Sequence, residues 1–267
     1  MLDTSLLELW PLVVAGGFVV GFLVGMTGVG AGSLMTPFLI SQVGVAPSLA
    51  VGTDLLFAGL TKASAAARHH SFGNVSWPIV RWLALGSVPG ALFMLLLLGY
   101  LKPDVEAISR VIKGSLAVTL VFSSFAIVLY PLLARGRLQL AASDADPPVR
   151  ALPTLLLGFT IGTMVTLTSV GAGAIGVVVL SALYSRLITR RLVGTDIVHA
   201  IPLTLISGAG HASMGNANLL LLAMLLAGSI PGIALGARLT GKLPDWMLRV
   251  VLAVVLMIAA YQLYQKI

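Results

Sequence analysis

The sequence contains no cysteine and few charged residues. Asp, Glu, Lys and Arg make up 9% of its 267 residues, whereas about a quarter of a soluble globular domain is charged. Without cysteine there are no disulfides. No group of His, Asp and Glu has the spacing of metal ligands, so we expect neither a metal nor another cofactor. With 58% hydrophobic residues and a mean hydropathy of +1.04, the composition excludes an ordinary soluble protein.

Long apolar runs fill most of the chain. Several approach the roughly 20 residues that a helix needs to cross a bilayer. This predicts an all-α polytopic membrane protein embedded in lipid. The ten apolar segments are residues 10–26, 28–43, 47–68, 78–99, 107–131, 152–168, 170–185, 190–210, 217–236 and 246–265.

Two short motifs occur twice at a nearly fixed separation. Residues 27–33 (TGVGAGS) correspond to residues 168–174 (TSVGAGA), and residues 51–54 (VGTD) correspond to residues 193–196 (VGTD). Each glycine cluster interrupts an apolar run, and each aspartate lies inside one. We therefore predict that the chain is an internal duplication.

Two more blocks match in the same order. They pair His70 and Gly73-Asn74 with His211 and Gly215-Asn216, and residues 85–90 with residues 227–232. The resulting organisation is a first transmembrane repeat at residues 1–133, a cytoplasmic linker loop at 134–150, and a second repeat at 151–267.

The basic residues gather in alternate loops between the apolar segments. If every segment crosses once, these loops lie on one side, which the positive-inside rule assigns to the cytoplasm. Both termini then lie outside, in a multi-pass protein of the cell inner (cytoplasmic) membrane. The net charge of +7 thus predicts membrane orientation and not nucleic-acid binding. The basic residues on the cytoplasmic side are Lys62, Arg68, Arg135, Arg137, Arg150, Arg186, Arg190, Arg191, Arg238 and Lys242.

Equivalent loops of the two repeats have opposite charge character, which an odd number of segments per repeat explains. Five segments invert the second repeat relative to the first, a recurrent design of secondary transporters. The segments beside each glycine cluster are short and form either a re-entrant helix pair or two full crossings. Six, eight or ten full crossings therefore remain open.

The two glycine clusters are the predicted substrate site. A helix broken inside a membrane exposes backbone groups that must face protein, water or ligand, and its N-terminal N–H groups suit a small anion. The alternative is that these glycines only pack helices together. The predicted substrate-binding residues are Thr27, Gly28, Gly30, Gly32, Ser33, Thr53, Thr168, Ser169, Gly171, Gly173 and Thr195.

Asp54 and Asp196 are the only acids inside apolar segments. A charged side chain in a membrane costs about 2.5 kcal/mol or more and usually marks a pathway; the alternative is that each carboxylate caps a broken helix. His199 lies one helical turn after Asp196, so these three residues are the predicted proton-coupling group. Lys62 is either an anion contact or a side chain that snorkels to the cytoplasmic interface.

With these motifs in place, the chain resembles the sulfite exporter TauE/SafE family. The resemblance covers both repeats and rests on residues 28–32, 51–54, 73–77 and 86–90, with His70 and Pro37. It implies transport of small sulfur oxyanions or organosulfonates, such as sulfite or sulfoacetate. The chain has Ala31 where the family often has glycine, and Asp54 and Asp196 where many members have serine. These departures bear on the substrate and on its coupling.

We therefore predict a secondary transporter that moves a small sulfur-containing anion by alternating access, coupled to a proton or, alternatively, to sodium. It is not expected to be an enzyme. The rivals are a passive anion channel with the same site and an intramembrane aspartyl protease built on the two aspartates. The sequence leaves export or import, and monomer or homodimer, open.

Overall fold

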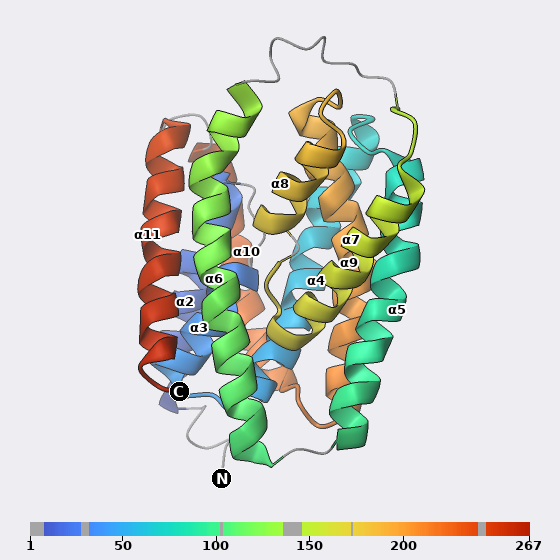
Figure 1. Ribbon diagram of the computed structural model, residues 1–267. Coiled ribbons are helices and arrows are strands. Elements are labelled where there is room, and N and C mark those ends of the chain that lie inside the picture. Colours follow the sequence, from blue (N-terminus) through green and yellow to red (C-terminus); the bar gives the residue numbers. More distant parts are fainter. Residues whose placement is uncertain (1–7, 28–31, 102–103, 136–145, 172, 240–243) are drawn as a thin grey trace.

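The computed structural model describes residues 8–27, 32–101, 104–135, 146–171, 173–239 and 244–267. Every element in these ranges is a helix (Figure 1). The elements are α2 (Trp10–Thr27), α3 (Gly32–Phe38), the π-helix η1 (Leu39–Val43), α4 (Pro47–Ser71), α5 (Trp77–Leu101), α6 (Val105–Arg135), α7 (Ala151–Thr168), α8 (Ala174–Leu183), α9 (Thr189–Ser213), α10 (Leu219–Leu239) and α11 (Asp245–Tyr264).

The helices follow the predicted apolar segments closely, and the chain is an all-α multi-pass membrane protein. Within the described ranges, six helices are long and apolar enough to cross a bilayer: α5, α6, α7, α9, α10 and α11. The central helix α4 has 25 residues but is not among these six. Segment 28–43 contains two short helices, α3 and η1, and α8 has only 10 residues. The segments after the glycine clusters are thus shorter helices than their apolar runs suggest.

The direction of the helices can be followed in Figure 1. Helix α6 rises from the lower end of the bundle to the upper end, and α11 descends beside it. Helix α7 begins at the upper end and α8 returns towards that end. The pair α7 and α8 therefore enters and leaves on the same side, as a re-entrant pair would.

The helices pair across the two repeats in a reciprocal pattern. By the sequence match, α2 corresponds to α7 and α5 to α10. Helix α2 packs on α10 of the second repeat, while α7 packs on α5 of the first. The equivalent helices α4 and α9 pack on each other, and so do α6 and α11. A two-fold axis between the repeats would produce this pattern. The inverted topology of the second repeat stays a prediction.

Glycines bring the reciprocal helix pairs into backbone contact. A Cβ atom at Gly21 of α2 would lie 2.5 Å from the Ser229 carbonyl oxygen, and one at Gly228 of α10 would lie 2.0 Å from the Val14 carbonyl oxygen. The matched pair α5 and α7 is equally close, since a Cβ atom at Gly86 would lie 2.0 Å from the Leu155 carbonyl oxygen. Small residues allow such close packing where lipid offers no hydrophobic drive for association. The repeated glycines at 86 and 228 are therefore packing residues.

The turns after α4 and α9 correct one detail of the sequence match. The Asn74 N–H donates to the His69 carbonyl at 2.9 Å, and the Asn216 N–H donates to the His211 carbonyl at 2.8 Å. His69 is therefore the equivalent of His211, and the pairing of His70 with His211 was wrong by one residue. The adjacent histidines at 69 and 70 made the two alignments equally plausible in sequence.

Candidate transport site

The two predicted acids lie on the paired central helices α4 and α9. Asp54 is 0% exposed and Asp196 is 1% exposed. The Thr36 hydroxyl, from α3, donates a hydrogen bond of 2.5 Å to Asp54 Oδ2. The Ser169 hydroxyl, from the helix break of the other repeat, also interacts with the Asp54 carboxylate. Asp54 thus joins its own short helix to the opposite glycine break.

Asp196 lies against the short helix of its own repeat, but without a hydroxyl partner. A Cβ atom at Gly176 of α8 would lie only 2.3 Å from Asp196 Oδ1, so only a glycine leaves room for this carboxylate. Oδ1 is buried and has no hydrogen-bond partner among the described residues, which also holds for Asp54 Oδ1. The difference is that Asp54 Oδ2 accepts from Thr36, whereas Gly176 at Asp196 has no hydroxyl to donate. The two acids are equivalent in sequence and different in environment.

Lys62 is the charged group that connects the two acids. It lies two turns after Asp54 on α4 and is 8% exposed. Its ammonium interacts electrostatically with both Asp196 and Asp54, and it also acts on His199. This burial does not fit a side chain extended to the membrane surface. Lys62 belongs to the same cluster as the two acids.

His199 is held by the first repeat. Its Nε2 lies 2.8 Å from the Ser87 hydroxyl of α5, and its side chain is 0% exposed. The matched position in the first repeat is Phe57, which is also fully buried. Among the described residues, no three His, Asp or Glu side chains lie close enough together to hold a metal ion.

The second helix break has the geometry that its glycines predict. Helix α7 ends at Thr168, and Ser169, Gly171 and Gly173 follow with φ values of 60°, 126° and 129°. These values favour glycine and strain other residues. The Thr168 hydroxyl accepts from the Val170 N–H at 3.2 Å and lies 2.8 Å from the Met164 carbonyl. The Thr168 hydroxyl therefore supplies the acceptor for a backbone N–H that lies just beyond the end of α7.

The first break is described only in part. Gly28 and Gly30 lie outside the described residues, and so does the side chain of Thr27. Gly32 is the first residue of α3, and Ser33 is the second and is half-buried. The role of these five residues in substrate binding stays a prediction.

Thr53 and Thr195 hold the two repeats together. The Thr53 hydroxyl accepts a hydrogen bond from the Asn218 N–H at 3.1 Å, just before α10. The Thr195 hydroxyl accepts one from the Ser76 N–H at 2.9 Å, just before α5. Ser76 and Asn218 are themselves equivalent, so the contact is reciprocal. Each threonine satisfies an N–H at the start of a helix in the other repeat, as a capping residue does.

The preceding glycines of the same motif allow that contact. A Cβ atom at Gly52 would lie 1.8 Å from the Asn216 carbonyl oxygen, and one at Gly194 would lie 2.0 Å from the Asn74 carbonyl oxygen. The motif VGTD therefore contains a close backbone contact, a capping hydroxyl and a central acid in three successive residues.

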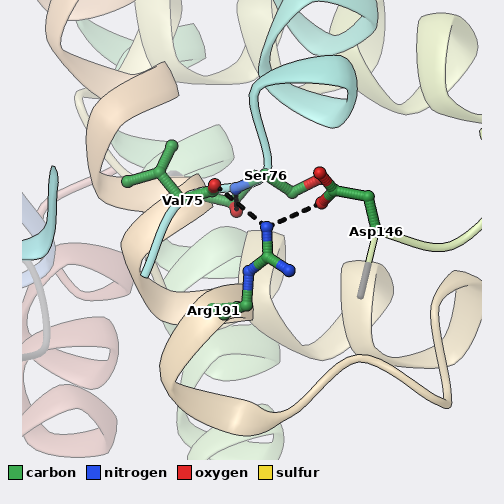
Figure 2. Close-up of polar contacts among 5 residues, drawn as sticks. Val75, Ser76, Asp146 and Arg191 are labelled. Carbon is green, nitrogen blue, oxygen red and sulfur yellow. Dashed lines mark hydrogen bonds and ion pairs between the residues drawn. The ribbon is translucent and has the colours of Figure 1, made fainter. Parts of the chain in front are cut away.

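Arg191 ties the start of α9 to two loops at one end of the bundle (Figure 2). Its guanidinium donates to Asp146 Oδ1 at 2.7 Å and to the Val75 carbonyl at 3.2 Å. Arg191 is buried, while the Asp146 side chain is 41% exposed. The first repeat has Leu49 at the matched position, so this tether exists in one repeat only.

Sequence reasoning did not identify Thr36, Ser87 or the Arg191–Asp146 pair. Thr36 and Ser87 are isolated hydroxyls in apolar segments, and such residues commonly bond only to their own helix. Two buried acids nevertheless require partners, and that requirement could have directed attention to polar residues on neighbouring segments. Asp146 carries no such signal because it lies in a loop.

Comparison with known proteins identifies the family. The sequence profile of the sulfite exporter TauE/SafE family matches residues 13–263. The chain belongs to that family. The Bacillus subtilis (strain 168) protein named "probable membrane transporter protein YjnA" is 34% identical over 255 residues, which cover 94% of this chain and 98% of the relative. A Haemophilus influenzae "probable membrane transporter protein" is 27% identical over 94% of this chain and 96% of its own length.

The family and these relatives indicate a membrane transporter. No solved structure matches the chain. The TauE/SafE resemblance seen in the motifs is thereby confirmed for almost the full length.

Proposed function

We propose that this TauE/SafE protein is a secondary transporter that moves a small anion, sulfite or an organosulfonate, across the cytoplasmic membrane with a coupled proton. The observation that carries the proposal is the buried cluster of Lys62, Asp54 and Asp196 between the central helices α4 and α9. In such a cluster the lysine can bind an anion and either aspartate can bind a proton, so both would bind at the same place.

The substrate would bind at Lys62 beside the helix breaks. Anions are stabilised by a buried ammonium and by helix N-terminal N–H groups. Ser169 already lies at the Asp54 carboxylate, so a small oxyanion near Lys62 is within reach of the second break. The sulfur of a sulfonate is tetrahedral, and its three oxygens can accept hydrogen bonds from donors in several directions, such as Lys62 and the N–H groups of the helix breaks.

Charge balance supports coupling. With both acids ionised the cluster has a net charge of −1, which repels an anion. A proton on one acid makes the cluster neutral and leaves Lys62 available to the substrate. Burial strengthens this effect because the charges are weakly screened. Proton binding and anion binding therefore favour each other.

The arrangement of the repeats supports alternating access. The domains 1–133 and 151–267 pack reciprocally, with α4 and α9 in contact at the centre. In inverted-repeat transporters a binding site near the midplane opens to each side as one repeat or bundle moves relative to the other. We place the linker 134–150 in the cytoplasm and the chain termini outside, as the charges of the loops predict.

The test is flux in proteoliposomes. Labelled sulfite and sulfoacetate are presented with and without a pH gradient, with taurine and sulfate for comparison. We expect saturable uptake of at least one sulfur anion that an imposed pH gradient drives above equilibrium. Counterflow of labelled anion against its gradient distinguishes a carrier from a channel. Absence of flux for every sulfur anion would overturn the proposal.

A further inference from the structure

We infer that Asp196, and not Asp54, carries the proton that accompanies each anion, and that the anion displaces Asp196 from Lys62. The inference rests on the proposed transport function and assigns different roles to two acids that the repeat makes equivalent.

Asp54 has a partner that does not depend on Lys62. The Thr36 hydroxyl donates to Asp54 Oδ2 at 2.5 Å. Hydrogen bonds to an ionised group are roughly twice as strong as neutral ones and favour the charged form. The charged form of Asp54 therefore keeps one stabilising partner when substrate engages Lys62.

Asp196 has no such partner in the described part of the chain. Its Oδ1 lies against the Gly176 backbone and accepts no hydrogen bond. Gly176, which faces Asp196, has no side chain that could donate as Thr36 donates to Asp54. The charge of Asp196 is therefore balanced by Lys62 alone.

The other groups around Asp196 do not change this balance. Lys62 reaches it from α4, and His199 lies on its own helix. Helices α7 and α8 carry no ionisable side chain, and the only charged residue of α5, Arg81, is exposed. His199 is occupied at Nε2 by Ser87.

Coupling follows from competition for one cation. When an anion binds Lys62, the negative charge of Asp196 is no longer balanced by the Lys62 ammonium. Asp196 then takes a proton from the side of the membrane to which the site is open. A monoanion adds one negative charge and the proton adds one positive charge, so the cluster keeps its net charge of −1. Release reverses both events: the anion leaves, the proton departs, and Asp196 returns to Lys62. No covalent bond other than O–H forms or breaks.

The experiment compares Asp196→Asn with its matched control Asp54→Asn in proteoliposomes. The probe is whichever of sulfite and sulfoacetate the unchanged protein transports, and a trapped pH dye reports proton movement. We expect Asp196→Asn to keep anion counterflow within about tenfold while losing proton movement and the response to a pH gradient. Asp54→Asn should keep the proton-to-anion ratio of the unchanged protein. Proton movement retained in Asp196→Asn, or lost in Asp54→Asn, would overturn the inference.

A second variant leaves every charge in place, which guards against misfolding of the asparagine variants. Thr36→Val removes the hydroxyl that donates to Asp54 and touches nothing at Asp196. The pH at half-maximal flux should therefore stay as in the unchanged protein. A shift of that pH by about one unit in Thr36→Val would contradict the assignment. If the unchanged protein transports no sulfur anion, the proposed function fails; if it does and these variants disagree, only this inference fails.

Discussion

Thr53 and Thr195 make the same contact from opposite repeats, whereas the acids that directly follow them do not. Each threonine hydroxyl accepts an N–H at the start of a helix in the other repeat, at 3.1 and 2.9 Å. One residue later, Asp54 accepts a hydroxyl hydrogen bond at Oδ2, whereas no hydroxyl of the described residues donates to Asp196. The two repeats are thus alike in the contacts between them and different in the surroundings of their buried acids.

This difference separates two demands on a duplicated transporter. The backbone contacts between repeats have to be equivalent if the repeats exchange roles during alternating access. The central side chains are free to diverge, because the proposed site is shared by both repeats. The divergence is seen in His199 opposite Phe57.

The largest effect is expected from Lys62→Met, which removes the cation that both acids share. Loss of one partner of a buried charge group costs about 2–5 kcal/mol. At about 1.4 kcal/mol per factor of ten, anion flux in proteoliposomes should fall by about 30-fold or more.

Lys113→Met is the matched control, because the Lys113 ammonium bonds the Lys266 carbonyl at 2.8 Å, away from the acids. Flux through this variant should stay within about twofold of the unchanged protein. Equal flux in the Lys62→Met and Lys113→Met variants would show that Lys62 is not part of the transport site. The different roles assigned to the two acids would then lose their basis.

Gly52→Ala and Gly194→Ala test the part of the comparison in which the repeats are alike. Their Cβ atoms would lie 1.8 and 2.0 Å from backbone carbonyl oxygens of the other repeat. Overpacking of this kind costs about 1–3 kcal/mol, and occasionally more. Unfolding in mixed micelles should show similar losses of stability for both.

Gly99→Ala is the control for these variants, since nothing lies within 4 Å of a Cβ atom there. It should leave stability equal or slightly higher, because alanine favours helix. A large loss at only one of positions 52 and 194 would show that the two contacts are not equivalent.

Thr53→Val and Thr195→Val should each lower the free energy of unfolding by about 1–2 kcal/mol, because each leaves an N–H at a helix start without its acceptor. The same unfolding assay measures both. Thr160→Val is the control, since that hydroxyl bonds only within α7, to the Leu156 carbonyl. If the losses of unfolding free energy in Thr53→Val and Thr195→Val differ by more than about 1 kcal/mol, the two threonine contacts between the repeats are not equivalent.

The smallest effect is expected from Arg191→Leu, which gives α9 the residue that the first repeat has at position 49. The variant loses the 2.7 Å pair with Asp146 and the bond to the Val75 carbonyl. Asp146 is 41% exposed and can be hydrated, so the loss should be about 1 kcal/mol or less. Arg186→Leu, at an exposed position before α9, is the control and should leave stability unchanged. A loss well above that in Arg191→Leu would make the tether a main determinant of stability.

Much of the fold could be predicted because the membrane imposes simple rules on sequence. The ten apolar segments lie within a few residues of the helices, since helix length follows bilayer thickness. The repeated motifs identified the central helices and both acids. The sequence did not reveal how each motif residue is used, because Thr53, Gly52 and Asp54 are neighbours in sequence and face different parts of the molecule.

The sequence by itself determined the membrane class, the duplication, the family resemblance and the two buried acids. These properties depend on composition and on local pattern, which a single chain displays directly. Only the tertiary structure decided that α2 pairs with α10 and α5 with α7, that Lys62 lies in the centre, and that Thr36 donates to one acid while Gly176 lies at the other. Such contacts join residues far apart in sequence, and their geometry depends on how closely glycine lets the helices approach.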